Sequence, residues 1–396
     1  MVKRNKILKK VKLVTSVVLG SAFIFTMSVN PDIYVKASED TQTVSSDYEA
    51  VNEKEEEEYH DKIEKEYFKS NDEIASYASS KTLTPQEKKE FKVIFLPVGK
   101  GTNGEVRGDA IFIQCDGEYA LIDAGAENGR CYRFLESYRE NGKINLKYVI
   151  LTHHHNDHYT GLKKLVEASD VKVGKFYQPK SHSNLELFKN QDSGCTKESY
   201  TNLMKKIKAK WKCETIPNLN LDSDDIINET KTVKLRVGSA TIYVYKNLIK
   251  NSDKNKWGCN EFENNRSLVC RVEYKGKRIL LTGDVYSEIV QRTQSMWTNI
   301  YANKKGDASK VTSSEKNIQL RADVVKMQHH GILSTWNDTI KSIYTDGFNA
   351  SVYVVSNSRE PNDKGWKSGA VNRNTYLKSI GKKILYTTYK EQKIGK

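Results

Sequence analysis

Several motifs that mark large enzyme classes are missing from this chain of 396 residues. The sequence contains no phosphate-binding P-loop, no glycine-rich dinucleotide fingerprint and no serine-centred nucleophile elbow. Its six cysteines are never spaced as Cys-x-x-Cys, which argues against a zinc ribbon. Outside the cell these cysteines could form disulfides, but their spacing does not determine which of them pair. The chemistry must therefore come from other residues.

Long apolar runs are also scarce, and only one segment approaches the length that crosses a membrane. Residues 3–12 carry six basic side chains, Leu13–Val29 is largely apolar, and Val35-Lys36-Ala37 resembles a small-x-small cleavage site. This order predicts a secretory signal peptide over residues 1–37 and an extracellular protein. The alternative is an uncleaved anchor, because about 17 apolar residues lie at the lower limit for spanning a bilayer. Both alternatives place the remaining residues outside the cell.

Charge is distributed unevenly along the sequence. Residues 1–37 have a net charge of +6 and residues 38–90 a net charge of −9, within a chain whose total is +14. Residues 91–396 therefore carry about +17. Such an excess attracts polyanions, and both DNA and phosphate-rich cell-wall polymers fit this description. A Lys-rich surface that only keeps the protein soluble is the alternative interpretation.

The composition divides the exported part into two segments. Residues 38–90 are polar, include the acidic run at residues 53–58, and have too few apolar side chains to bury much surface. We interpret them as an acidic spacer or pro-region, although an acidic face could also dock on the basic body and compete with substrate. Residues 91–396 are long enough for one domain with a substantial core.

Four of the eight histidines lie in one hexapeptide, His153-His154-His155-Asn156-Asp157-His158. In an extended segment, side chains two residues apart point to the same side, so His153 and His155 converge while His154 faces away. If the chain then turns, Asp157 and His158 face a second point nearby. Imidazole and carboxylate groups bind zinc and similar ions, and two such ions ~3.5–4 Å apart can share one water. The spacing predicts a hydrolytic metal site, and a solvated His-rich loop is the alternative.

The rest of the body alternates between short apolar runs and amphipathic stretches. Mixed strands and helices, with the polar motifs at strand ends, favour two sheets packed face to face and covered by helices. No internal repeat is strong enough to indicate a solenoid. Strand-like runs lie at residues 92–96, 110–114, 120–123, 148–151, 175–178, 233–237, 241–245, 268–274, 278–282, 324–327, 351–356 and 383–387, and helical stretches at 130–141, 159–168, 199–211 and 285–293.

The hexapeptide follows the apolar run Tyr148–Leu151, and this arrangement resembles the HxHxDH signature of the metallo-β-lactamase superfamily. Two later segments match that family in order: residues 278–284, which end in Gly-Asp, and residues 323–331, which end in His-His-Gly. The resemblance implies an α/β fold, a four-layer αββα sandwich. It also implies two divalent metal ions, zinc in the first place with manganese as the alternative.

The resemblance assigns roles to individual residues. Asp284 would bridge the two ions, and His330, which directly precedes Gly331, would close the second site, although the order within the His pair is nearly undetermined. His329 would then contact a substrate oxygen or donate a proton. Asp123, at the end of another strand, would orient the histidines by hydrogen bonds rather than bind metal. The implied ligands are His153, His155, Asp157, His158, Asp284 and His330.

One metal motif of the family has only a weak counterpart here. A lone His is expected between the hexapeptide and the bridging Asp, and His182 is the single candidate, in a loop-like stretch. Without it, one ion would be completed by water or absent, which leaves a one-metal site as an alternative.

Within the superfamily, the chain looks most like the domain at the end of the bacterial competence DNA-uptake channel and its secreted relatives. The resemblance covers about residues 91–396 and rests on Phe95–Gly101, Gly108-Asp109-Ala110 and Asn265–Val269. Here residues 102–107 are inserted before the Gly-Asp-Ala stretch, and we expect them to form a loop beside the site. Because the transmembrane channel is missing, the chain cannot itself be the DNA pore.

These observations lead to three functional hypotheses. The first is a secreted phosphoesterase, either a nuclease or a phosphodiesterase, that cleaves DNA or a teichoic-type polymer with a metal-activated water held by Asp157. The second is a β-lactamase or lactonase that acts on a small cyclic amide or ester. The third is a DNA-binding surface module with a vestigial metal site. The fold alone does not choose among them, and the positive charge favours the first.

Overall fold

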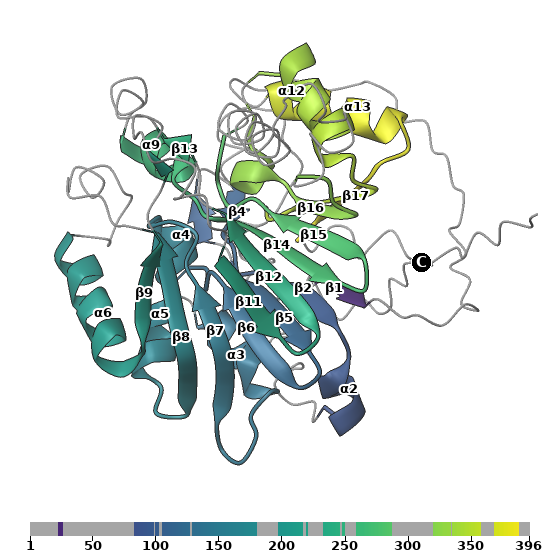
Figure 1. Ribbon diagram of the computed structural model, residues 1–396. Coiled ribbons are helices and arrows are strands. Elements are labelled where there is room, and N and C mark those ends of the chain that lie inside the picture. Colours follow the sequence, from purple (N-terminus) through teal and green to yellow (C-terminus); the bar gives the residue numbers. More distant parts are fainter. Residues whose placement is uncertain are drawn as a thin grey trace, which may run out of the picture.

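The computed structural model consists of two large β-sheets with helices on their outer faces (Figure 1). Most of the body, from residue 83 onward, is described, together with one short strand from the N-terminal region. The structure describes residues 23–26, 83–98, 100–102, 105–126, 129–179, 197–216, 219–220, 233–245, 248–249, 259–286, 320–333, 335–357 and 368–387.

The first sheet has seven strands in the order β1-β2-β5-β6-β7-β8-β9. Its first four strands pair antiparallel, and β6 to β9 run parallel. The strands are β1 (Phe23–Thr26), β2 (Lys92–Phe95), β5 (Ile111–Cys115), β6 (Glu118–Ile122), β7 (Ile144–Ile150), β8 (Val171–Pro179) and β9 (Cys213–Ile216). The helices of this half are α2 (Pro85–Lys89), α3 (Arg130–Glu136), α4 (Asn156–Tyr159), α5 (Leu162–Glu167) and α6 (Lys197–Lys210).

The second sheet repeats this plan, again with seven strands, in the order β11-β12-β14-β15-β16-β17-β18. Its first four strands pair antiparallel and its last four parallel. The strands are β11 (Val233–Val237), β12 (Ala240–Tyr245), β14 (Val269–Tyr274), β15 (Lys277–Leu281), β16 (Val324–Lys326), β17 (Val352–Val355) and β18 (Lys383–Tyr386). The helices are α9 (Cys259–Asn265), the 3-10 helix η3 (Gln328–Gly331), α12 (Asp338–Ser342), the π-helix η4 (Ile343–Phe348) and α13 (Ser368–Ser379).

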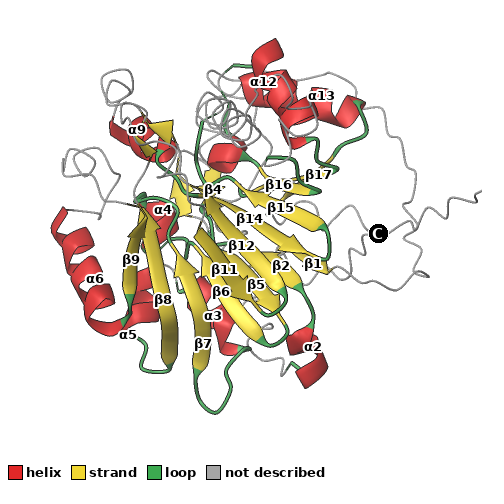
Figure 2. Ribbon diagram, in the orientation of Figure 1, coloured by secondary structure: helices red, strands yellow, loops and turns green. Residues whose placement is uncertain are grey.

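Figure 2 distinguishes the strands of the two sheets from the helices that cover them. Three apolar clusters fill the spaces between these layers. The central cluster joins the facing sides of the two sheets, where Ile113 and Ile150 pack with Val244 and Leu281. The other two clusters lie under the outer helices of each half. Fully burying one such side chain stabilises the fold by about 1.5–3 kcal/mol. The predicted four-layer αββα sandwich is therefore confirmed.

The burial pattern of the strands agrees with this layering. In β12, Ile242 and Val244 are buried between the sheets while Thr241 and Tyr243 are partly exposed on the outer face. Strand β17 is buried at every position. Alternation is typical of a strand with one open face, and a continuous apolar run is typical of a parallel strand that is covered on both faces.

The structure corrects one helix prediction and describes only the first two residues of another. The helix expected over residues 159–168 is broken between α4 and α5, because Gly161 packs directly on the loop that follows β6. A Cβ atom at this position would lie 2.0 Å from the Ala124 carbonyl oxygen, and the Gly161 N–H donates to the Gly125 carbonyl at 2.8 Å. Residues 285–286 are not helical, and the rest of the helix expected over residues 285–293 lies outside the described residues.

Other expectations fall largely on segments that the structure does not describe. This holds for residues 1–37 apart from β1, for the acidic segment up to residue 82, and for His182. Within the described ranges, no helix has the length and apolarity needed to cross a bilayer. Four of the cysteines, at positions 115, 131, 213 and 270, are free thiols.

Candidate metal centre

The polar motifs meet at one rim of the sandwich because they follow neighbouring strands. The hexapeptide directly follows β7, Asp284 follows β15, and the His329-His330 pair follows β16. Asp109 lies just before β5. Since β15 and β16 run parallel, their carboxyl ends lie at the same edge of the second sheet, and the packing of the sheets brings the end of β7 beside them.

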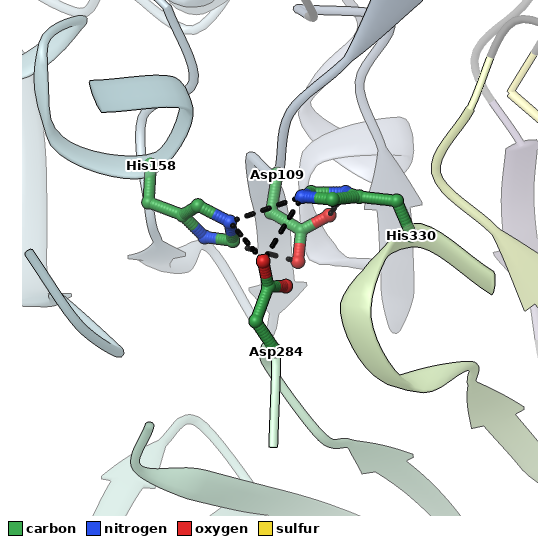
Figure 3. Close-up of side chains that lie close together, drawn as sticks. All are labelled: Asp109, His158, Asp284 and His330. Atoms are coloured by element: carbon green, nitrogen blue, oxygen red, sulfur yellow. Dashed lines mark hydrogen bonds and ion pairs between the residues drawn. The ribbon is translucent and has the colours of Figure 1, made fainter. Parts of the chain in front are cut away.

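Four buried side chains form the first group, which we call the deep cluster: Asp109, His158, Asp284 and His330 (Figure 3). One ligand atom of each lies within 4.8 Å of the others. The Asp284 Oδ2 atom lies 3.1 Å from His330 Nε2 and 3.3 Å from His158 Nε2. The Nε2 atoms of His158 and His330 are 3.3 Å apart. Two carboxylates and two imidazoles therefore point at one another from four separate segments.

A second group, the hexapeptide cluster, consists of His153, His155 and the same Asp284. The His153 Nε2 atom lies 3.7 Å from Asp284 Oδ2 and 3.1 Å from His155 Nδ1. The buried Nε2 atom of His155 has no hydrogen-bond partner among the described residues. Asp284 thus lies between two sets of imidazoles.

Asp157, which the resemblance implied as a metal ligand, is a member of neither cluster and lies at the open side of the deep cluster. Its side chain is 22% exposed, whereas those of the four cluster residues are at most 2% exposed. Its Oδ2 atom lies 3.1 Å from His330 Nε2, and its carbonyl accepts the N–H of Asp109 at 3.2 Å. The neighbouring His158 and His330 outweigh the effect of burial and lower the pKa of Asp157. The carboxylate is therefore ionised at neutral pH and faces the accessible side.

Asp123 lies behind the hexapeptide and makes three short contacts. Its carboxylate accepts the Thr152 N–H and the Thr152 hydroxyl, each at 2.7 Å, and lies 2.8 Å from His158 Nδ1. The His158 Nε2 atom is thereby directed into the deep cluster. The family resemblance implied that Asp123 orients the histidines; the structure places its carboxylate against the His158 ring, and Asp123 belongs to neither cluster.

His154 faces away from both clusters, as the alternation of side chains predicted. Its backbone N–H donates to Glu263 Oε1 at 3.0 Å, and its ring Nδ1 lies 2.7 Å from the same oxygen. Burial raises the pKa of Glu263, but His154 and Arg266 outweigh it and lower that pKa to about 2. A buried ion pair between Glu263 and Arg266, 3.0 Å long, completes this anchor.

The two members of the late His pair have different positions. His330 points into the deep cluster, and its Nδ1 lies 3.1 Å from the Ser356 hydroxyl. His329 lies outside both clusters, 3.4 Å from the Asn264 amide nitrogen. Asp284, Asp109 and Asp157 outweigh burial and raise the pKa of His330 to about 10, whereas burial lowers the pKa of His329 to about 3.

Sequence reasoning missed two residues of the site. Asp109 was noticed only as part of the Gly-Asp-Ala stretch and received no role, although an acidic residue directly before an apolar strand was the available signal. Lys326 was missed because it lies in an apolar strand. Its fully buried ammonium group lies 2.6 Å from Asp109 Oδ2 and 3.4 Å from Asp284 Oδ1, and donates to the Gly283 carbonyl at 2.9 Å. These carboxylates outweigh burial and raise the pKa of Lys326.

The inserted residues 102–107 contribute to a two-stranded hairpin, β3 (Lys100–Thr102) with β4 (Glu105–Arg107). Arg107 forms an antiparallel bridge with Asn357. The residue before Asn357 is Ser356, whose hydroxyl contacts His330. The insertion therefore lies beside the site, as expected, but residues 105–107 form a strand rather than the expected loop. A second small ladder joins β10 (Leu219–Asn220) to β13 (Leu248–Ile249).

The donor set fits divalent metal ions. Imidazole nitrogens and carboxylate oxygens are the ligands that zinc and manganese share. The buried, unpartnered Nε2 atom of His155 fits this interpretation, because a buried polar atom without a partner is costly unless a ligand satisfies it.

Comparison with known proteins finds one matching family. The profile of the Metallo-beta-lactamase superfamily matches residues 103–192, which contain the hexapeptide and Asp109. The match covers less than a quarter of the chain and shows that this segment is similar to the superfamily. Among curated proteins, no sequence matches the chain.

The solved structures that match this chain do so with low sequence identity and low TM-scores. A mutant of the CmlA beta-hydroxylase matches with a TM-score of 0.38 and 14% identity, covering 72% of this chain and 53% of the other, so this chain spans about half its length. The metallo-beta-lactamase fold protein YhfI from Bacillus subtilis matches with a TM-score of 0.36 and 12% identity, covering 75% of this chain and 95% of the other. The short form of human tRNase Z matches with a TM-score of 0.35 and 15% identity, covering 67% of this chain and 92% of the other.

Proposed function

We propose that this protein is a secreted, metal-dependent phosphoesterase that acts on a polyanion such as DNA or a teichoic-type polymer. The observation that carries the proposal is the pair of ligand clusters that share Asp284. Two adjacent ions are the arrangement that clamps the attacking and leaving oxygens of a phosphoryl group. The excess of about +17 on residues 91–396 supports a polyanionic substrate.

Each cluster would hold one divalent ion, with zinc proposed first and manganese second. His153, His155 and Asp284 would bind one ion, and Asp109, His158, Asp284 and His330 the other. Bound ions supply Lewis-acid polarisation of the phosphoryl oxygen and lower the pKa of water toward ~7. In this proposal Asp109 is the fourth ligand of the second ion, so that ion does not need His182 as a ligand.

The remaining polar side chains would orient the reactants. Asp157 is ionised and lies at the accessible side, so it can accept a hydrogen bond from the attacking water and hold its direction. His329 lies outside the clusters with a low pKa, so at neutral pH it is an uncharged hydrogen-bonding group for a substrate oxygen. Asp123 fixes the direction of the His158 ring.

The relationship to the competence-type domain belongs to the same proposal. The Gly-Asp-Ala stretch that suggested it contributes Asp109 to the deep cluster, and the Asn265–Val269 stretch lies next to the anchor of His154. These motifs therefore lie at the metal centre rather than on a remote surface. This location supports the proposal that the chain and the competence-type domain catalyse the same type of reaction.

A substrate panel tests this function. Metal-loaded protein is assayed with plasmid DNA, a bis-aryl phosphodiester, an aryl phosphorylcholine and a chromogenic cephalosporin. We expect turnover of at least one phosphoester and none of the cephalosporin. Turnover of the cephalosporin alone would contradict the substrate class, and DNA binding by protein that takes up no metal would favour the vestigial binding module.

Two variants serve as controls for the panel. His155→Ala removes a ligand from the hexapeptide cluster only, whereas Asp284→Asn changes the residue that both clusters share. We expect His155→Ala to retain about one ion and Asp284→Asn to retain fewer, by elemental analysis. Activity should fall at least ~100-fold in both, because positioned electrostatic groups contribute on this scale. Equal metal content in wild type and both variants would exclude these clusters as the site.

A further inference from the structure

The turn that carries His330 has a strained backbone. His329, His330 and Gly331 follow one another with φ values of 44°, 53° and 80°, all in the left-handed region. Residues with a Cβ atom rarely adopt this conformation, and here two of them do so in succession. Such strain persists only where the surrounding structure enforces it. The contacts that hold this turn therefore determine where the His330 ring points.

Arg373 on α13 provides the contact at the end of the turn. Its guanidinium Nη2 atom donates to the Gly331 carbonyl at 2.8 Å. Gly331 itself is tightly packed, because a Cβ atom there would lie 2.8 Å from Val355 Cγ1 and 3.5 Å from the same guanidinium nitrogen. One helical turn before Arg373, the Ala370 N–H donates to the Leu333 carbonyl at 2.9 Å. Helix α13 thus holds the chain directly after the late His pair at two points.

The same guanidinium reaches the start of the turn through Tyr344. Its Nη1 atom lies 3.4 Å from the Tyr344 hydroxyl, and its Cζ atom lies 5.6 Å from the centroid of the Tyr344 ring. That hydroxyl donates to Oε1 of Gln328, the first residue of η3, at 2.5 Å. The Tyr344 carbonyl in turn accepts the Tyr353 hydroxyl at 2.8 Å, which holds Tyr344 against β17. Both ends of the turn are therefore connected to one side chain.

The surroundings of Arg373 show that its shape matters more than its charge. The side chain is fully buried, and its Nε atom donates to the Asn374 amide oxygen at 3.0 Å. In the described part of the chain, its hydrogen bonds thus go to a carbonyl, a hydroxyl and an amide, all of them neutral. Burial of a guanidinium among neutral acceptors costs free energy, and an apolar side chain of similar volume would pack there at lower cost. An apolar side chain could not supply the planar fork of donors that reaches two segments at once.

We propose that Arg373 is a positioning residue of the metal centre, which fixes the turn at residues 328–331 so that His330 Nε2 points at Asp284 (Figure 3). This inference rests on the metal site of the proposed function but not on the choice of substrate. His330 belongs to the deep cluster alone, so loss of the guanidinium should weaken the ion held there and leave the ion of the hexapeptide cluster bound. Removal of a group that orients a ligand weakens metal binding by about 10–100-fold.

The test compares full-length wild type with Arg373→Met and Tyr344→Phe. Arg373→Met removes the guanidinium at similar length, and Tyr344→Phe removes only the hydroxyl between Arg373 and Gln328. Zinc affinities are measured by competition with a chromophoric chelator. Of two binding constants, we expect one to weaken by about 10–100-fold in Arg373→Met and by about 2–10-fold in Tyr344→Phe. The other should stay unchanged. In a His155→Ala background, where only the deep cluster is complete, the remaining ion should show the same losses.

Cobalt(II) provides a readout that a loss of stability alone would not change. Its visible absorption bands depend on the directions of its ligands, so they should shift in folded Arg373→Met. Leu377→Ala is the matched control, because Leu377 is buried on the same helix in the apolar cluster of the second half. It should lower the melting temperature and leave zinc affinities and the cobalt spectrum at wild-type values.

Two results would overturn the proposal. One is an equal loss of zinc affinity in Leu377→Ala and Arg373→Met, which would indicate a merely structural effect. The other is unchanged zinc binding in folded Arg373→Met. Tyr344→Phe keeps the packing of its ring, so its zinc binding decides the question if Arg373→Met does not fold.

Amide hydrogen exchange separates a failure of this inference from a failure of the proposed function. If wild-type protein binds no zinc, the proposed metal site fails. Exchange in metal-free protein still tests the turn through two amides: the His329 N–H donates to the Gly283 carbonyl at 3.2 Å, and the Ile332 N–H to the His329 carbonyl at 2.8 Å. Faster exchange of these amides in Arg373→Met, with unchanged exchange in β17, supports the role of Arg373 in fixing the turn. Equal exchange in wild type and variant overturns it.

Discussion

Lys326 gives the site an internal positive charge. Its ammonium group pairs with Asp109 at 2.6 Å and with Asp284 at 3.4 Å, and it is fully buried. Two carboxylates packed among histidines repel each other unless a cation lies between them, and a fixed lysine reduces this repulsion before any ion binds. Lys326 therefore keeps the deep cluster assembled and ready for metal.

The substitution Lys326→Met tests this role. It leaves Asp109 and Asp284 without their buried partner, so we expect metal-free protein to lose about 3–5 kcal/mol in its free energy of unfolding. The loss should be smaller after zinc loading, because the ion then balances the carboxylates. Urea denaturation with and without a chelator measures both values. Lys277→Met is the control, because the partly exposed pair of Lys277 with Asp323 should contribute at most about 1 kcal/mol.

Proton release provides a second test at the level of residues. In the absence of metal, the pKa of His330 is raised to about 10 and that of His158 is also raised, so both imidazoles are protonated at pH 7. An imidazole must be neutral to bind metal, so zinc binding releases protons and its affinity rises with pH. Calorimetry at pH 7 in two buffers of different ionisation enthalpy should show this release. Identical heats in both buffers would contradict it.

The same shifts set the pH dependence of the metal-free fold. The pKa of His330 is higher in the folded chain than the usual value near ~6.5, which applies to the unfolded chain. Protonated His330 therefore stabilises the folded state, and this contribution is complete below a pH of ~6.5. This contribution is lost as the pH rises through about 10. Metal-free protein should therefore be less resistant to urea at pH 10 than at pH 7, and the Asp284→Asn variant, which lacks the largest favourable partner, should show a smaller difference.

At the level of elements, the loop that carries the hexapeptide is held by close backbone packing. Gly161 lies against Ala124 with no space for a side chain, and this contact separates α4 from α5. The Ala124 N–H in turn donates to the His158 carbonyl at 2.9 Å. The loops after β6 and β7 therefore keep a fixed distance from each other.

Gly161→Ala should disturb both the fold and the metal site. The added methyl group would overlap the Ala124 carbonyl, so we expect a loss of about 1–3 kcal/mol in the free energy of unfolding and at least ~10-fold weaker zinc binding. Denaturation and competition with a chromophoric chelator measure the two effects. Gly117→Ala is the comparison: its φ of +82° is strained for alanine but nothing lies within 4 Å, so zinc affinity should not change.

The elements show which parts of the site the sequence could predict. The opposite directions of His153 and His154 follow from the period of a strand. The Gly-Asp and His-His-Gly endings after β15 and β16 were recognised only through the family resemblance. The break at Gly161 was missed because it depends on a tertiary contact with Ala124. Asp109 and Lys326 were missed because only the packing of the two sheets brings them beside Asp284.

For the whole molecule, the two halves have the same strand order and the same change from antiparallel to parallel pairing. The sequence showed no repeat strong enough to reveal this likeness of the two halves. Two segments can have the same strand order while few of their side chains are the same. The deep cluster takes Asp109 and His158 from the first half and Asp284 and His330 from the second. An ion bound there connects the halves.

Removal of metal should therefore destabilise the whole fold. A ligand that binds only the native state stabilises it by about 1.4 kcal/mol for each tenfold excess of free ligand over Kd. We expect a lower melting temperature in chelator, restored by added zinc, in scanning calorimetry. Asp284→Asn should show little or no shift. An equal melting temperature of wild-type protein with and without zinc would contradict a connecting role.

The burial of the deep cluster also has a kinetic consequence. Its four side chains are at most 2% exposed, and Asp157 is the neighbouring carboxylate with measurable exposure. A cation seated there can leave only when the surrounding loops open, and such openings are slow in a well-packed rim. If the protein is exported and binds metal as proposed, an ion acquired during folding would stay in place through long dilution. The metal supply at the place of folding, rather than at the place of action, would then determine which ion the protein carries.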